Sequence, residues 1–289
     1  MPIAIRTRAE RLVASPYGRF VGIELDAIEP GRVRLRLSAR DDTGNRNGSL
    51  HGGVTASLLD VAGTVAAASV TPELGEGSAS TIDLAVHYLA PAVGEGLIVD
   101  GAVTRRGREI VFVEATVVSE GGTAIARSTG AVRVASPLGG DPPPSAPPCP
   151  IDATTPLVPW RSGSAFTRRL GVLTASLGVG HAVLVLPARA ELCDVDGGIH
   201  EGALAALVDS AGGAAAWSVD GFDPRGRAAT IGMHLCYDRA PAGDDVVVEA
   251  RTTWRAAGIF LNTVMLTARA SGRPVATGSV TYRIVRPES

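Results

Sequence analysis

The sequence predicts an α+β protein made of two copies of one domain, each a curved antiparallel sheet wrapped around a long central helix. Two observations support this fold class. Residues 45–63 (NRNGSLHGGVTASLLDVAG) and 194–212 (DVDGGIHEGALAALVDSAG) share a histidine, a glycine two places on and an aspartate nine places on. In both copies a helical pattern and then several strand-like runs follow the histidine. A repeat of this kind indicates a duplicated fold.

The two copies are offset by 149 positions along most of the chain. The matched pairs include His51 with His200, Gly53 with Gly202, and Asp60 with Asp209. The offset predicts a first domain at residues 1–135 and a second at residues 161–289, each long enough to bury its own core. Residues 136–160 between them hold nine of the 19 prolines. We expect this linker to form an extended strap on the surface that neither pairs in a sheet nor forms a helix.

Each predicted domain begins with a hairpin, with Gly31 or Gly180 at its turn and alternating apolar residues after it. A helix is expected from about Gly53 and again from about Gly202. Spacings of three and four place Asp60 and Asp209 on a helical stripe of small residues. Strands are then predicted at 80–91, 95–106, 110–119 and 123–134, and at 229–241, 245–255, 259–270 and 273–285. Paired domains would join their sheets edge to edge, which covers exposed strand edges.

Composition excludes several classes of function. The net charge of −2 favours neither nucleic acid nor an anionic membrane as partner. All 27 basic residues are arginine, so Schiff-base chemistry and a Walker-type phosphate loop are excluded. Cys149, Cys193 and Cys236 form no CxxC pair, and the histidines outside the repeat share no metal-like spacing, so no metal is expected. Free thiols and the absence of a long apolar segment predict a cytoplasmic protein.

The first copy of the repeat resembles a known enzyme family. The pattern N-x-x-G-x-x-H-G-G followed by L-x-D-x-A is carried by Asn45, Gly48, His51, Gly52, Gly53, Leu58, Asp60 and Ala62. This pattern resembles the hotdog-fold acyl-CoA thioesterases of the PaaI-like (phenylacetate-pathway) group. Thr81, with its counterpart Thr230, matches the family's water-orienting serine or threonine. The similarity covers both halves, so the chain resembles a tandem, or double, hotdog.

The resemblance implies a mechanism that needs two hotdogs. A thioester carbonyl would point at the helix N-terminus, where backbone N–H groups and the helix dipole stabilise an oxyanion. Gly52 and Gly53 would allow close approach, and Asn45 would help to hold the carbonyl. An aspartate from the other domain's helix would act as general base on water, or as nucleophile. Coenzyme A would enter only as part of the substrate, with no separate cofactor.

Two inequivalent sites follow from the tandem arrangement. Site A combines Asn45, His51, Gly52 and Gly53 with Asp209 and Thr230. Site B combines Asp194, His200, Glu201 and Gly202 with Asp60 and Thr81. In site B, Asp194 stands where Asn45 offers an amide donor, and Glu201 replaces a motif glycine. Our hypothesis is that site A is competent and site B is weak or altered.

Several alternatives stay open at this point. The histidines could cap or brace the helix starts rather than take part in catalysis, and the aspartates could make buried structural hydrogen bonds. Arginines near two strand junctions could bind the phosphates of coenzyme A or lie in solvent; these are Arg105, Arg106, Arg108, Arg251 and Arg255. The rival functions are a non-catalytic acyl-CoA-binding protein and a hotdog hydratase or dehydratase. Two chains are expected to form a homodimer of double hotdogs.

Overall fold

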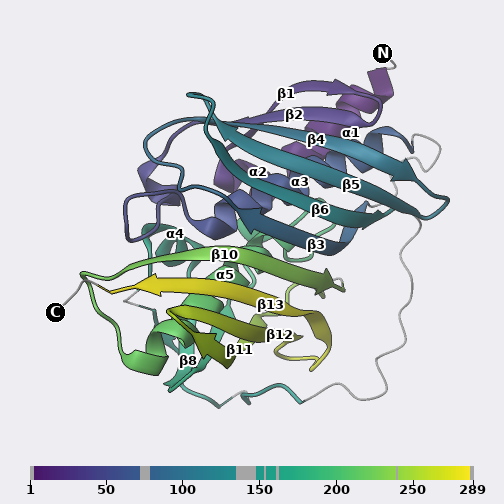
Figure 1. The fold of residues 1–289 in the computed structure, drawn as a ribbon. Helices are drawn as coiled ribbons and strands as arrows, with labels where there is room; N and C mark the ends of the chain where they lie inside the picture. The colour runs from purple at the N-terminus through teal and green to yellow at the C-terminus, as the bar shows by residue number, and fades with distance from the viewer. Residues whose placement is uncertain are drawn as a thin grey trace.

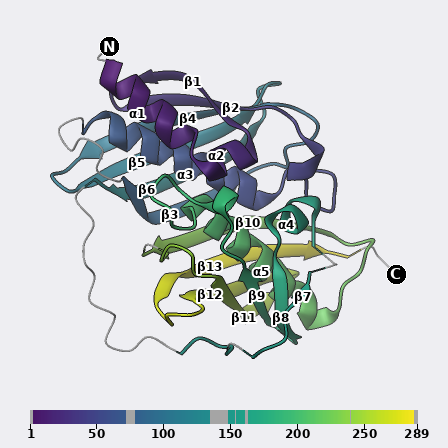
Figure 2. The same ribbon diagram turned by 180° about the vertical axis from the view of Figure 1, so that it is seen from behind.

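The computed structural model describes residues 3–71, 79–134, 148–152, 154–160, 163–238 and 240–286. Two long helices, α3 (Gly52–Ser69) and α5 (Glu201–Asp220), lie under one continuous antiparallel sheet (Figures 1 and 2). This arrangement confirms the predicted α+β class with one central helix in each half.

The remaining strands follow the predicted order in both halves, and the short helices beside them were not predicted. The first half contains α1 (Ile3–Val13), α2 (Pro16–Val21), β1 (Ile23–Glu29), β2 (Arg32–Leu37), η1 (Asp41–Thr43), β3 (Ser80–Tyr88), β4 (Leu97–Arg106), β5 (Ile110–Ser119) and β6 (Ala124–Arg133). The second half contains α4 (Ala165–Leu170), β8 (Leu173–Gly178), β9 (His181–Leu186), η3 (Ala190–Leu192), β10 (Arg227–Tyr237), β11 (Val246–Ala256), β12 (Ile259–Ala268) and β13 (Pro274–Val285). Gly31 and Gly180 have φ of 77° and 65°, as the hairpin turns that they were expected to form require.

The two half-sheets join edge to edge, as expected. The strand order is β1-β2-β4-β5-β6-β3-β10-β13-β12-β11-β9-β8-β7, where β7 is Val158–Pro159 in the linker, so β3 and β10 form the seam between the halves. These two strands are antiparallel, with Leu84 opposite Leu235 and Asp83 opposite Cys236. Pairing at the seam buries one edge of each half-sheet.

Small residues let the helices approach the sheet and each other. A Cβ at Gly63 would lie 2.9 Å from Val113 of β5, and one at Gly212 would lie 2.8 Å from Val280 of β13. A Cβ at Gly53 would lie 2.3 Å from the Cα of Ala206. The start of α3 therefore lies directly against α5. This contact brings a helix N-terminus of one half next to the helix of the other half.

The linker differs in one respect from its prediction. Positions 136–147 and 153 lie outside the described residues. In the described part, Cys149, Ile151 and Leu157 pack on a buried valine cluster of the second half. The expectation that no part of the linker pairs in a sheet is wrong, because β7 (Val158–Pro159) pairs with β8. The proline is tolerated because β7 is the edge strand, where one side of the backbone needs no partner.

Among the helices of the described ranges, none has both the length and the apolar character needed to cross a membrane.

Candidate active site

Both repeated histidines cap the N-termini of the central helices. The Nδ1 atom of His51 accepts a hydrogen bond from the N–H of Gly53 at 3.0 Å, and His200 Nδ1 accepts from Gly202 at 2.9 Å. Burial lowers the pKa of both imidazoles, that of His200 to about 4. Both rings are therefore neutral near pH 7, as accepting an N–H bond requires. Of the two roles considered for these histidines, the structure supports capping.

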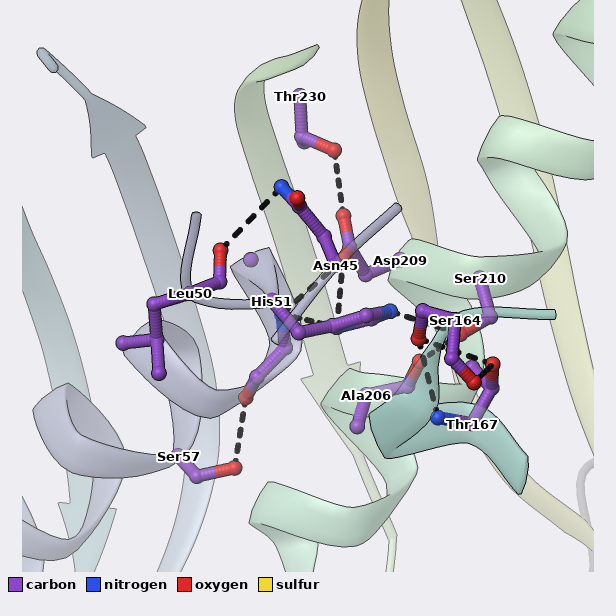
Figure 3. Close-up of polar contacts among 12 residues, drawn as sticks. Asn45, Leu50, His51, Ser57, Ser164, Thr167, Ala206, Asp209, Ser210 and Thr230 are labelled. Atoms are coloured by element: carbon purple, nitrogen blue, oxygen red, sulfur yellow. Dashed lines mark hydrogen bonds and ion pairs between the residues drawn. The ribbon is translucent and has the colours of Figure 1, made fainter. Parts of the chain in front are cut away.

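At site A, the carboxylate of Asp209 lies against the N-terminus of α3 (Figure 3). Its Oδ2 atom accepts from Gly53 N at 3.0 Å and lies 3.2 Å from His51 Nδ1. The neutral imidazole and the carboxylate thus share one N–H donor. The hydroxyl of Thr230 donates to Asp209 Oδ1. The structure therefore brings together the four residues His51, Gly53, Asp209 and Thr230, as the site A hypothesis requires.

Glycine at position 52 is what lets Asp209 reach the helix. A Cβ added at Gly52 would lie 2.9 Å from Asp209 Oδ2 and 3.1 Å from Oδ1. Such distances are too short for any side chain to fit without moving the carboxylate. The matching position of α5 holds Glu201, and at site B a carboxylate oxygen of Glu201 lies within 4.8 Å of the Asp60 carboxylate.

Site B has a different geometry around Asp60. Thr81 donates to Asp60 Oδ1 at 2.6 Å, and Thr64 contacts the same Thr81 hydroxyl at 3.0 Å. Within the described ranges, the hydrogen bond recorded for the Gly202 amide goes to His200. Burial raises the pKa of Asp60 to about 6. Asp60 therefore carries the predicted threonine contact without the contact to the helix amide that Asp209 makes.

A small cavity borders Asp60. It has a volume of about 40 Å³, and its polar lining includes Thr64, Asp194, His200 and Glu201. A space of this size holds water but no acyl chain. At site A the corresponding wall is different. The counterpart of Thr64 is Gly213, and the ring of Tyr282 packs on it. A Cβ at Gly213 would lie 3.3 Å from this ring.

Asn45 and Asp194 both brace the loop in front of their helix. Asn45 Oδ1 accepts from the amides of Asn47 at 2.8 Å and Ser49 at 3.1 Å, and Asp194 Oδ1 accepts from its equivalent amides at 2.7 and 3.1 Å. Asn45 Nδ2 donates to Ser49 Oγ at 2.7 Å. It also donates to Leu50 O at 3.4 Å (Figure 3). An aspartate replaces the asparagine without losing the loop contacts, because the oxygen makes them. The Asn45 amide must turn away from Ser49 or Leu50 before it can hold a carbonyl.

The first-half loop at site A is tied to the second half. The guanidinium of Arg46 lies 4.3 Å from the ring centroid of Phe222, and Asn47 Nδ2 donates to Ala228 O at 3.1 Å. The loop that carries Asn45 precedes the start of α3, and these two contacts fix its position against the second half. They join residues that are more than 170 positions apart, so the sequence alone did not show them.

Sequence reasoning also missed the polar residues that join the two helices. Ser57 Oγ lies 2.7 Å from Gly53 O, 2.9 Å from Gly202 O and 2.9 Å from the hydroxyl of Tyr17. Ser210 Oγ lies 3.4 Å from His51 Nε2 (Figure 3). Each serine has an apolar counterpart in the other copy, Ala206 for Ser57 and Val61 for Ser210. These two differences between the copies are the feature of the sequence that could have identified the serines.

The arginines considered for coenzyme A binding are on the sheet surface. Arg251 and Arg255 form ion pairs with Glu249 and Asp220. Arg105 and Arg106 are exposed at the end of β4, and Arg108 follows in the turn. Their role in phosphate binding stays a prediction.

Comparisons with known proteins agree with this architecture. The sequence profile of the thioesterase superfamily matches residues 47–126 and 196–257, one segment in each copy. A solved protein from Alicyclobacillus acidocaldarius, described as having a hot dog fold, aligns over 97% of this chain and 98% of its own, with a TM-score of 0.69 and 15% identity. The double hotdog fold that the repeat and the family resemblance together predicted is confirmed.

Two relatives are similar in sequence. A Halobacterium salinarum protein that carries an esterase name is 37% identical over 113 residues, or 38% of this chain and 74% of that protein. Acyl-coenzyme A thioesterase 13 of Homo sapiens is 32% identical over 101 residues, or 34% of this chain and 70% of the human protein. Together with the profile match and the fold, these similarities show that the chain belongs to the thioesterase superfamily.

Proposed function

We propose that this protein is an acyl-CoA thioesterase of the PaaI-like group that hydrolyses an acyl thioester to a free acid and coenzyme A. One observation carries the proposal. The Asp209 carboxylate of one half lies 3.0 Å from the Gly53 N–H at the helix N-terminus of the other half. A base and a donor for a developing oxyanion therefore occupy the same small volume.

The proposed reaction begins with the thioester carbonyl at the start of α3. When the substrate binds, its carbonyl oxygen replaces Asp209 Oδ2 as acceptor of the Gly53 N–H, and this N–H, the N–H of Gly52 and the helix dipole polarise the carbonyl. Asp209 removes a proton from water as its oxygen attacks the carbonyl carbon. The C–S bond then breaks, and the thiolate of coenzyme A leaves and takes up a proton. We favour a general base over a nucleophile because Thr230 holds Asp209 through Oδ1, which leaves Oδ2 to accept a proton from water once the Gly53 N–H has turned to the substrate.

We propose that site A performs this reaction and that site B contributes little. At site A, Gly52 leaves room for Asp209 beside the helix amides. At site B, Glu201 adds bulk and negative charge at the same place, and Asp194 has no amide donor to offer. Each site needs one carboxylate as the base, and a second negative group next to the developing oxyanion raises the energy of the transition state.

Site B has one feature that favours a second candidate function. Single ligand atoms of Asp60, His200 and Glu201 lie within 4.8 Å of one another beside the cavity. A carboxylate facing an imidazole is the arrangement that a hydratase acting on the β-carbon of an acyl thioester needs. Hydration of an unsaturated acyl-CoA yields an alcohol without releasing thiol, so product analysis separates the two reactions.

One chain supplies both halves of each proposed site. We propose that the two halves are domains at residues 1–135 and 161–289, joined by the linker between them.

We also propose that two chains form a homodimer. Light scattering tests this assembly, and a mass equal to a single chain would rule it out.

The deciding experiment is a panel of acyl-CoA thioesters with detection of the released thiol. The panel pairs aromatic with aliphatic and saturated with unsaturated acyl groups. We expect thiol release by the wild-type protein and its loss in the Asp60→Asn/Asp209→Asn double variant. Binding of acyl-CoA without any turnover would instead identify a non-catalytic acyl-CoA-binding protein.

A further inference from the structure

We propose that Asp83, His234 and Cys236 form a binding site for Zn²⁺ on the outer face of the sheet. The three residues lie on the seam strands β3 and β10, on the face opposite α3 and α5. Neither the sequence spacing nor the proposed thioesterase reaction accounts for this cluster. No metal was expected from the sequence, because the cysteines form no CxxC pair and the histidines share no metal-like spacing. Asp83 and Cys236 are 153 positions apart.

The sheet itself brings the three side chains together. His234 and Cys236 are two positions apart on β10, so they point to the same face. The register places Asp83 of β3 directly opposite Cys236, and residues at directly opposed positions have neighbouring side chains. His234 and Asp83 are 50% and 40% exposed, so an ion can reach them from solvent.

The distances suit a tetrahedral ion. His234 Nε2 lies 2.6 Å from Asp83 Oδ2, Cys236 Sγ lies 3.7 Å from the same oxygen, and the three ligand atoms are all within 4.8 Å. Ligand bond lengths around Zn²⁺ imply separations of about 3.3 Å between N and O and about 3.5 Å between S and O. The sulfur-to-oxygen distance is therefore already close to the required value. The histidine and aspartate need to separate by about 0.7 Å.

The chemistry of the ligands also fits. One imidazole, one thiolate and one carboxylate form a donor set that a borderline-soft ion such as Zn²⁺ prefers over Mg²⁺ or Ca²⁺. The ion displaces the thiol proton of Cys236 and the proton between His234 and Asp83. The thiolate and carboxylate then balance the charge of the ion. Three protein ligands leave the fourth position to water from solvent.

A second group of possible ligands in the described part of the chain does not qualify. Asp60, His200 and Glu201 also lie within 4.8 Å of one another. His200 Nδ1 accepts the Gly202 amide, so in the neutral ring the proton is on Nε2. That nitrogen can bind an ion only if the helix cap is broken. In the described part of the chain, His234 lies on a strand, caps no helix, and pairs through Nε2 with the Asp83 carboxylate.

The position of the site gives it a structural consequence. The seam between β3 and β10 is where the sheets of the two halves are hydrogen-bonded. An ion held by Asp83 from one half and by two ligands from the other would cross-link the halves. Binding to the folded state alone stabilises that state. We therefore expect Zn²⁺ to raise the melting temperature of the whole chain.

The test uses tag-free protein kept reduced with a phosphine and titrated with Co²⁺. Thiolate ligation of Co²⁺ produces a charge-transfer band in the near ultraviolet. We expect this band to saturate at one equivalent and to disappear when Zn²⁺ is added. Cys236→Ser should abolish it, and His234→Gln should weaken Co²⁺ binding at least tenfold. The matched controls Cys149→Ser and Cys193→Ser, which change the other two thiols, should keep it.

Thiol release from acyl-CoA serves as an independent check that each variant is folded. Cys236→Ser should retain the wild-type rate because its side chain lies on the outer face of the sheet. The absence of a thiolate band in the wild-type protein would overturn the proposal. So would a band that survives Cys236→Ser, or one that His234→Gln leaves unchanged. The proposal stands or falls by these spectra whether or not the protein hydrolyses thioesters.

Discussion

The backbone N–H of Gly53 donates to Asp209 Oδ2 at 3.0 Å, although the two residues are 156 positions apart. This bond joins the N-terminus of one central helix to the middle of the other. It places a carboxylate where a helix dipole favours negative charge. Neither half of the chain contains this arrangement by itself. The duplication is therefore a requirement of the proposed site as well as a feature of the fold.

Gly52→Ala should reduce thiol release because the new methyl group would lie 2.9 Å from Asp209 Oδ2. The carboxylate must move away from the helix, and a shift of about 1 Å can lower kcat by about a hundredfold. Steady-state kinetics measures the loss. Glu201→Ala, at the same position of α5, is the matched control and should leave the rate within a few-fold of wild type. An active Gly52→Ala enzyme would show that the position of Asp209 is unimportant.

Thr230→Val should lower kcat because it removes the hydroxyl that donates to Asp209 Oδ1 while keeping the shape of the side chain. A hydrogen bond to a charged group is worth about 1.5 to 3 kcal/mol, so we expect a loss of about tenfold to a hundredfold. Thr230→Ser should recover most of the activity. Thr81→Val removes the same contact at site B and should have little effect. If the two valine variants lose equal activity, Thr230 has no special role.

Asp60→Asn should stabilise the protein at neutral pH. Burial raises the pKa of Asp60 from 3.8 to about 6, so the folded state binds a proton more tightly than the unfolded state. The stability due to this proton is present below pH 4 and is lost as the pH rises through 6. The cost above pH 6 is on the order of 2 to 3 kcal/mol, which the neutral amide avoids.

Urea unfolding at pH 4.5 and at pH 7.5 measures this effect. The variant should gain more stability over wild type at the higher pH. A gain that is the same at both values, or larger at pH 4.5, would contradict the raised pKa. Asp244→Asn is a comparison that changes a carboxylate outside the two sites.

Ser57→Ala should destabilise the fold because Ser57 connects the two helices. Its hydroxyl lies within hydrogen-bonding distance of Gly53 O, Gly202 O and the buried Tyr17 hydroxyl. Loss of a buried partner costs about 1 to 3 kcal/mol in the free energy of unfolding. Ser218→Ala, in the partly exposed end of α5, should cost less. Equal losses would show that the helix-to-helix contact adds nothing.

The repeat made most of the fold predictable. The offset of 149 positions aligned the helices and strands of both halves, and Gly31 and Gly180 marked the hairpin turns correctly. The α1, α2 and α4 helices were not predicted. The α2 and α4 helices occupy matching positions of the repeat, but each has only six residues, too few for a clear helical period. The short strand at Val158–Pro159 was missed because prolines argue against sheet pairing in general but not at an edge.

The candidate site was predictable only in part. The motif identified Asp209, Gly53 and Thr230, and the structure brings these residues together. The sequence could not show that Asn45 uses its amide within its own loop, since that depends on the loop conformation. It also could not show the small cavity beside Asp60 that Glu201 helps to line, because the cavity is bordered by residues from both halves that meet only in three dimensions.

The most direct test of the central claim measures thiol release by Asp209→Asn and Asp60→Asn as separate variants, at saturating acyl-CoA and pH 7.5. Both substitutions keep the size of the side chain and remove its ability to accept a proton. Because Asp209 is the carboxylate that reaches the helix amides, we expect Asp209→Asn to lose at least a hundredfold in kcat and Asp60→Asn to stay within a few-fold of wild type. Equal losses in the two variants, or a larger loss in Asp60→Asn, would contradict the assignment of catalysis to site A.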